Sequence, residues 1–218
     1  MDLLVPTSLG DSRLVVDEAV DARAVLWLGH GAGGGIDAAD LAALASELPR
    51  LGITVARYEQ PWRVAGLKVA PRPAALDMAW LEATRRVVEL AAGRPLIVGG
   101  RSAGARVACR TASTVLASGV VCLAFPLHPP GRPEKSRLTE LLLPEVPVLV
   151  VQGDRDPFGS AALVTGEVDG RSGIRVVEVA GADHGMKVLK SSTLDAAAVA
   201  SLVVDAVAGF VAGLVPGH

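Results

Sequence analysis

The chain has 218 residues, half of them apolar and a fifth charged, with a formal net charge of −2 at neutral pH. This is the composition of a soluble globular protein, and the length predicts a single domain over residues 1–218. The nearly balanced charge and the scattered basic residues exclude the charge pattern of a nucleic-acid-binding protein.

Cysteine usage and hydropathy predict the compartment. Cys109 and Cys122 lack the spacing of a metal site, so we expect two free, buried thiols in a reducing environment. No basic stretch followed by an apolar run stands near Met1, which predicts that no signal peptide is present. The longest charge-free stretch, 111–131, is interrupted by glycine and prolines, so no membrane helix is predicted. We therefore expect a cytoplasmic protein with no membrane partner.

Short β-branched runs alternate with longer alanine-rich stretches along the chain. The first predicted elements are two short strands at 3–7 and 12–17, around a turn at Gly10 and Asp11, which we expect to form an antiparallel edge. Continuously apolar runs follow, which is typical of parallel strands covered on both faces: 24–28, 53–58, 95–99, 120–124, 146–152 and 174–179. Helices are predicted at 38–48, 74–92, 102–116 and 194–214. The alternation predicts an α/β domain, a mostly parallel sheet with helices on both faces.

A Gly-x-Ser-x-Gly motif with Ser102 at its centre is the sharpest local signal. It follows the predicted strand at 95–99 and opens the predicted helix at 102–116. This is the context of a nucleophile elbow, in which a strained turn lifts the serine hydroxyl above the sheet edge. Gly100 and Gly104 suit the close approach of strand and helix. The motif predicts Ser102 as a nucleophile.

A serine hydroxyl needs a base, and the base needs an acid to orient it. Of the four histidines, His184 follows the predicted strand 174–179 in a loop at the carboxyl end of the sheet. Asp156 follows the strand 146–152, with Asp154 as its rival two residues earlier. We prefer Asp156 because Pro157 favours an extended backbone before it. The order Ser102, Asp156, His184 is that of an α/β-hydrolase.

A glycine-rich loop at 29–35 follows the strand 24–28 and predicts an oxyanion hole. Its backbone N–H groups could converge on a developing negative charge, with donors from Ala103 and Ala32 and with Gly33 as the alternate. His30 is expected to brace the loop. The same glycines also match a dinucleotide fingerprint, with Glu59 as the ribose acid, and this keeps an oxidoreductase as a less favoured alternative.

At these residues the chain resembles small α/β-hydrolase-like proteins related to testis-expressed hydrolase-like protein and to a regulatory subunit of the non-specific-lethal chromatin complex. The matching segments are 29–35, 100–105, 125–135, 153–159 and 183–185, of which Pro-Leu-His-Pro-Pro-Gly is the most specific. Dienelactone-hydrolase-like families are a wider, weaker match. The resemblance implies the α/β-hydrolase fold and supports the predicted triad, but it implies no substrate. Because one relative acts as a scaffold, it also keeps a non-catalytic interaction module as an alternative.

Together, these motifs and the resemblance predict a serine hydrolase that acts on a small ester or thioester through an acyl-enzyme. The partner expected is a small-molecule acyl substrate, and neither a metal nor an organic cofactor is expected. The irregular connection at 125–145 is too short for a large cap domain. His30, Arg101 and His128 are possible substrate-site residues. The alternative for the two histidines is a role in holding their loops, and the alternative for Arg101 is a structural ion pair. The oligomeric state is left open.

Overall fold

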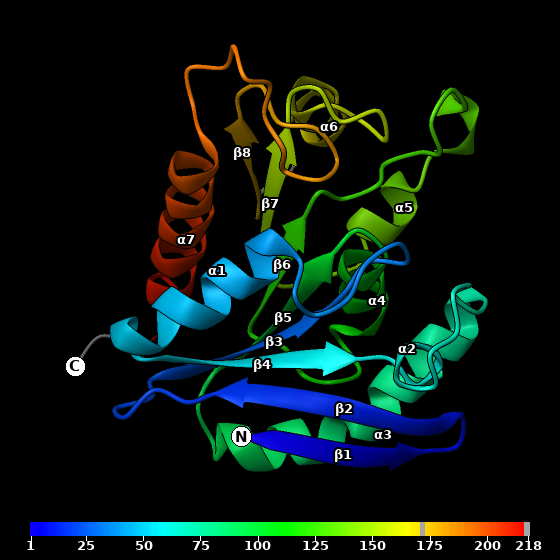
Figure 1. Cartoon of the computed structure of the whole chain (residues 1–218), viewed down its shortest axis with the longest axis vertical. Coiled ribbons are helices and arrows are strands. Elements are labelled where there is room, and N and C mark those ends of the chain that lie inside the picture. The colour runs from blue at the N-terminus through cyan, green and yellow to red at the C-terminus, as the bar shows by residue number, and fades with distance from the viewer. Residues whose placement is uncertain (171–172, 216–218) are drawn as a thin grey trace.

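The computed structural model describes residues 1–170 and 173–215, and in this part of the chain an eight-stranded sheet forms the centre of the molecule (Figure 1). The strand order is β1-β2-β4-β3-β5-β6-β7-β8. The strands are β1 (Asp2–Thr7), β2 (Gly10–Asp17), β3 (Ala24–Gly29), β4 (Ile53–Glu59), β5 (Leu96–Arg101), β6 (Gly119–Leu123), β7 (Val148–Gly153) and β8 (Ile174–Val179). β2 pairs antiparallel with β1 and β4, and every other pairing is parallel.

Helices cover both faces of this sheet, because its central strands are apolar on both sides. Every residue of β3, β6 and β7 is buried. On one face lie α1 (Ala39–Glu47), the 3₁₀ turn η1 (Leu48–Leu51) and α7 (Ala196–Ala212). On the other lie α3 (Pro73–Ala91), α4 (Ala103–Thr111), α5 (Leu138–Leu141) and α6 (Ala161–Val168). The predicted fold class is confirmed, and the described residues form no cap domain.

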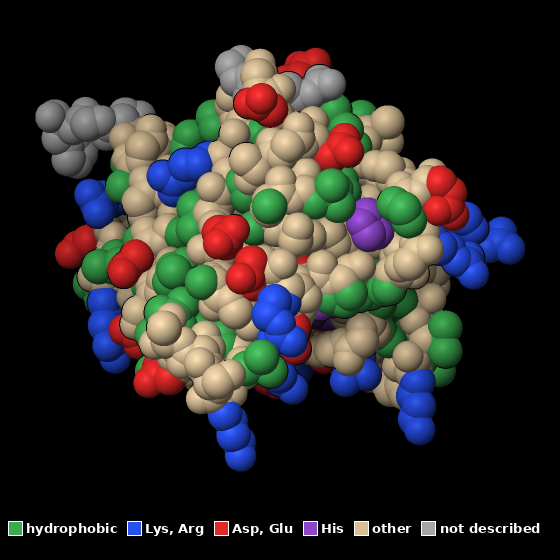
Figure 2. Space-filling model, turned by 90° about the horizontal axis from the view of Figure 1, so that it is seen from above, with side chains coloured by type: hydrophobic (Ala, Val, Ile, Leu, Met, Phe, Trp, Pro, Cys, Tyr) green, Lys and Arg blue, Asp and Glu red, His purple; other side chains and the backbone are tan. Residues whose placement is uncertain are grey.

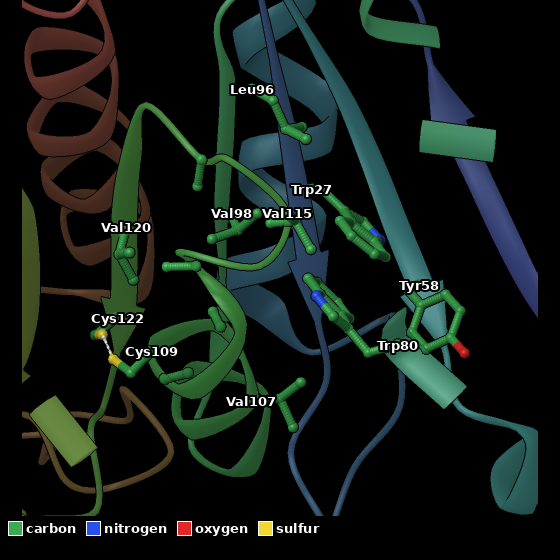
Figure 3. Packing of buried hydrophobic residues seen from close by; sticks show 14 of the residues in the cluster. Trp27, Tyr58, Trp80, Leu96, Val98, Val107, Cys109, Val115, Val120 and Cys122 are labelled. Carbon is green, nitrogen blue, oxygen red and sulfur yellow. Dashed lines mark hydrogen bonds between the residues drawn. The ribbon is translucent and has the colours of Figure 1, made fainter. Parts of the chain in front are cut away.

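The largest side chains of the core pack on the face covered by α3 and α4. The rings of Trp27 and Trp80 stack at a centroid distance of 3.5 Å, and Tyr58 meets each of them edge-on (Figure 3). Stacked and edge-to-face pairs of this kind stabilise a core beyond the area that they bury. The cluster joins β3, β4 and α3, and it therefore supports the strand from which the glycine-rich loop leaves.

The predicted helices differ from the observed ones in length and in number. α4 ends at Thr111 instead of 116, and Leu116 has a positive φ of 54°, which a helix does not allow. The sequence analysis missed the short helices α2 (Pro61–Val64), α5 and α6, and the 3₁₀ turns η1 and η2 (Pro133–Lys135). Four of the eight residues of α6, two valines, a threonine and a glycine, are weak helix formers. The cap that starts this helix is the Ser160 hydroxyl, which accepts from the N–H of Leu163 at 3.2 Å.

Within the described residues, no helix is long and apolar enough to cross a membrane. Seen from above (Figure 2), acidic and basic side chains are interspersed on the surface, and a histidine side chain is exposed among hydrophobic ones. This face includes the loops beyond β7 and β8, which hold two of the predicted site residues.

Candidate active site

Ser102 lies at a sharp turn between β5 and α4, with φ of 51° and ψ of −107°. The turn is possible because its glycine neighbours have no side chains. A Cβ at Gly100 or Gly104 would lie 2.4 or 2.3 Å from the carbonyl oxygen of Gly29, far inside contact distance. The strand and the helix can therefore close around the serine only with glycine at both positions.

His184 reaches Ser102 from the loop after β8. Its Nε2 lies 3.0 Å from the Ser102 Oγ, and its Nδ1 lies 2.8 Å from Oδ2 of Asp156. The ring of Phe158 packs against the imidazole with the centroids 4.1 Å apart. With its Nδ1–H donated to the carboxylate, the ring presents the Nε2 lone pair to the serine hydroxyl, the tautomer that proton abstraction requires.

The carboxylate of Asp156 is buried and accepts hydrogen bonds at both oxygens. Oδ2 also accepts from Gln152 Nε2 at 3.0 Å, and Oδ1 accepts from the N–H of Phe158 at 2.8 Å. Asp154, the rival in the sequence analysis, accepts from the N–H of Gly181 at 2.7 Å instead. Asp154 therefore joins two loops, while Asp156 is the carboxylate that meets His184.

The glycine-rich loop passes beside the serine. A Cβ built on Gly31 would lie 3.5 Å from the Ser102 Cβ. Ala32, Gly33 and Ala103 line the cleft at Ser102, and within the described residues their backbone N–H groups donate to no other protein group. This open cleft of about 470 Å³ thus combines a hydroxyl, an imidazole and unpaired amides, the parts needed for acyl transfer.

Residues 22–212 match the family described as alpha/beta hydrolase domain. The chain belongs to this family. The strand order and the elbow at Ser102 are those of an α/β-hydrolase, and they agree with the match.

Solved α/β-hydrolase structures superpose on nearly the whole chain. A serine hydrolase without a lid from Xanthomonas campestris has a TM-score of 0.76 at 18% identity, covering 100% of this chain and 96% of its own. A serine hydrolase homologue from Coxiella burnetii has 0.75 at 18%, covering 94% and 96%. The carboxylesterase EstE1, cloned from a metagenomic library, has 0.70 at 20%, covering 100% and 89%. At these identities the likeness shows the fold.

The remaining predicted site histidines in the described chain do not line this α/β-hydrolase cleft. His30 is buried, its Nδ1 lies 2.8 Å from the Gly31 carbonyl, and its Nε2 accepts from the N–H of Gln60 at 3.1 Å. His128 contacts the carbonyl of Pro129 through Nδ1. Both rings contact loop backbone and neither lines the cleft, so the expectation that they contact the substrate is corrected. His218 lies outside the described residues.

Arg101, the residue before Ser102, lines the cleft, but its guanidinium is bound to other protein groups. Its guanidinium pairs with the buried carboxylate of Asp40 and donates to the carbonyl oxygen of His184. Arg101 therefore joins the start of α1 to the histidine loop. This structural ion pair is the alternative role considered for Arg101, and it leaves little capacity for a substrate anion.

The dinucleotide interpretation of the glycine-rich loop does not fit this arrangement. Its fingerprint needs a helix that opens on the third glycine and points its N-terminus at the pyrophosphate. Here α1 begins only at Ala39, and Glu59 is paired with Arg13 at 2.9 Å. Among the described residues, moreover, no three His, Cys, Asp or Glu side chains gather as a metal site.

Sequence reasoning missed several residues that shape the site. Gln152 holds the Asp156 carboxylate, and Asp40 holds Arg101. Arg106 and Arg137 also line the cleft. Two of these had a visible signal: Gln152 is a polar residue in an apolar strand, and Arg106 follows Ser102 by one helical turn. Asp40 and Arg137 had none, because their partners lie far away in the chain.

Proposed function

We propose that this chain is a serine carboxylic ester hydrolase that cleaves a small ester or thioester through an acyl-enzyme. The observation that carries the proposal is the chain of hydrogen bonds from Ser102 through His184 to Asp156, 3.0 and 2.8 Å long, beside an open cleft that Ser102 and His184 line. Nucleophile, base and orienting acid in this order are the parts of a hydrolytic triad.

In the first half-reaction, Ser102 Oγ attacks the acyl carbonyl carbon as His184 Nε2 takes its proton. The carbonyl oxygen becomes negative and accepts from the N–H groups of Ala103 and Ala32, with Gly33 as the alternate donor. Asp156 stabilises the imidazolium. The tetrahedral adduct then collapses, the bond to the leaving group breaks, and His184 returns the proton to the leaving alcohol or thiol.

Water completes the cycle by the same route. His184 removes a proton from water, the hydroxide adds to the acyl carbon, and collapse releases the carboxylic acid and restores the Ser102 hydroxyl. A preorganised donor to the oxyanion typically lowers the barrier by about 3–4 kcal/mol. The open cleft of about 470 Å³ favours small acyl groups over long lipid chains.

Labelling with a fluorophosphonate probe, followed by peptide mapping, tests the proposal. We expect covalent labelling at Ser102 and hydrolysis of p-nitrophenyl butyrate, with both lost in S102A while its melting temperature stays close to wild type. S46A, at an exposed serine on α1, is the matched control and should be labelled normally. Labelling that persists in S102A would contradict the nucleophile. A folded wild type that is neither labelled nor active, and that co-purifies with a stable partner, would support a non-catalytic module instead.

A further inference from the structure

The cleft beside Ser102 has an unbalanced set of charges. Within the described residues, its lining includes Arg101, Arg106, Arg137 and His184 but no aspartate or glutamate. A cleft lined by cations of this kind concentrates anionic ligands. Which of these guanidinium groups is free to bind an anion depends on the other contacts that each one makes.

Two of the three arginines are held by carboxylates. Arg101 is committed to Asp40 and to the His184 carbonyl, as described above. Arg106 donates to Glu140 through Nε at 2.9 Å and Nη2 at 2.6 Å. Its Nη1 has no protein partner in the part of the chain that the structure describes.

Arg137 is the cleft arginine without a carboxylate. Its Nη1 donates to the carbonyl of Pro126 at 3.0 Å, and among the described residues it forms no ion pair. The nearby Glu140 is shared by Arg106 and Arg110, and Arg110 also pairs with Asp77. Arg106, Arg110 and Arg137 therefore carry three positive charges beside two carboxylates, Glu140 and Asp77, and the charge without a carboxylate is that of Arg137.

The surroundings of Arg137 favour a bound anion. Partial burial lowers the pKa of Arg137 from its ordinary value, and the charge of Arg106 lowers this pKa further, against the opposing effect of Glu140. An anion in the cleft would offset both effects. A carboxylate is the matching group, because two parallel N–H donors of a guanidinium fit its two oxygens.

Arg106 and Arg137 line the same cleft as Ser102 and His184, and backbone hydrogen bonds fix the position from which each side chain starts. Arg106 follows Ser102 by one turn, and its N–H donates to the Ser102 carbonyl at 3.2 Å. Arg137 precedes α5, and its N–H donates to the carbonyl of Leu127 at 2.7 Å. An anion bound by these two side chains would share one cleft with an acyl group on Ser102, so a single small molecule can carry both groups.

We propose that Arg137, with Nη1 of Arg106, forms a carboxylate-binding subsite, and that the substrate of this cleft is an ester or thioester bearing a carboxylate in its acyl or alcohol part. That the substrate is an ester or thioester rests on the proposed function. The subsite itself rests on the charges and contacts of the cleft.

Matched esters test the substrate class. With the charge on the acyl side, mono-p-nitrophenyl adipate is compared with its neutral methyl ester. With the charge on the alcohol side, 4-butyryloxybenzoate is compared with its methyl ester. We expect kcat/KM of at least one charged ester to exceed that of its neutral partner by about tenfold, the effect of one hydrogen bond to a charged group. Added salt should reduce this preference.

Substitution of Arg137 identifies the group responsible. R137Q should remove the preference, mainly through KM, and R137K should keep part of it because it keeps the charge. R132Q, at an exposed arginine on the same connection, should leave the preference intact. A merely structural Arg137 would instead lower the melting temperature and slow both esters equally. That result, or a wild type without any preference for charge, would overturn the proposal.

Calorimetric binding of adipate to S102A separates the subsite from the proposed function. If S102A binds adipate, R137Q/S102A does not, and the wild type hydrolyses no ester, the anion subsite is kept and the esterase is rejected. Hydrolysis without charge preference and without adipate binding would keep the esterase and reject the subsite.

Discussion

At the scale of single residues, Ser102 adopts a conformation that serine rarely adopts, and its surroundings offset the strain. A positive φ at a residue other than glycine typically costs on the order of 1–3 kcal/mol. Both backbone polar groups of Ser102 are nevertheless satisfied, since its N–H donates to Leu123 at 2.9 Å and its carbonyl accepts from Arg106 at 3.2 Å. A strained residue held in this way keeps its hydroxyl turned toward His184.

The two neighbouring aspartates should separate in their effects when substituted. D156N removes the charge expected to stabilise the imidazolium, so we expect kcat for an activated ester to fall by about 10²–10⁴-fold. D154A removes only the bond to Gly181, and should lower the free energy of unfolding by about 1 kcal/mol while kcat stays within a few-fold. Steady-state kinetics and denaturant unfolding measure both, and the opposite pattern would assign the acid to Asp154.

At the scale of elements, the site depends on how closely β3, β5 and α4 approach one another. Gly100 ends the buried part of β5 and Gly104 opens α4, and both face the carbonyl of Gly29 at the end of β3. The glycine-rich loop leaves β3 at this same point. Close packing of a strand end against a helix start therefore places Ser102 and the candidate oxyanion donors side by side.

A methyl group at Gly104 should disturb this contact far more than one elsewhere. The added Cβ of G104A would lie 2.3 Å from the Gly29 oxygen, so we expect a loss of stability of about 1–3 kcal/mol or more and a loss of probe labelling at Ser102. G166A is the control, because its Cβ in α6 meets nothing within 4 Å. Replacing that helical glycine should stabilise the protein by about 0.5–1 kcal/mol. Equal melting temperatures for the two variants would contradict the packing argument.

At the scale of the whole molecule, the sheet brings together loops that are far apart in the chain. Arg101 ties α1 to the loop after β8, Asp154 ties that loop to the one after β7, and His30 ties the glycine-rich loop to the end of β4. These contacts exist only in the folded state. The buried His30 therefore links the pH to the stability of the whole fold.

Stability should fall in acid partly through His30. Burial lowers its folded-state pKa below the ordinary 6.5, so in acid the unfolded chain binds a proton that the folded one does not. Above pH 6.5, His30 is neutral in both the folded and the unfolded chain. As the pH falls below 6.5, the unfolded chain takes up the proton first, so the free energy of unfolding decreases. Between pH 7 and pH 5, the difference in free energy of unfolding between wild type and H30Q should narrow, as measured by denaturant unfolding. H128Q serves as the control, and curves for H30Q that run parallel to wild type would contradict the assignment.

The fold class and the Gly-x-Ser-x-Gly motif could be predicted from the sequence because both depend on residues that are close together in the chain. Continuous apolar runs such as 120–124 predict buried parallel strands without knowledge of their neighbours, and a Gly-x-Ser-x-Gly between strand and helix follows from local sterics. The narrower resemblance to small hydrolase-like relatives, the single-domain boundary and the catalytic roles of Ser102, His184 and Asp156 stay predictions.

Only the tertiary structure decided which side chains meet across loops. Asp154 and Asp156 stand two residues apart in one loop, and their different partners, Gly181 and His184, depend on how the last two strands place the loops after them. The ion pair of Arg101 with Asp40 and the unmatched charge of Arg137 also depend on contacts between residues far apart in the chain. Local sequence determines backbone conformation and burial, whereas distances between residues far apart in the chain are set by the packing of the whole sheet.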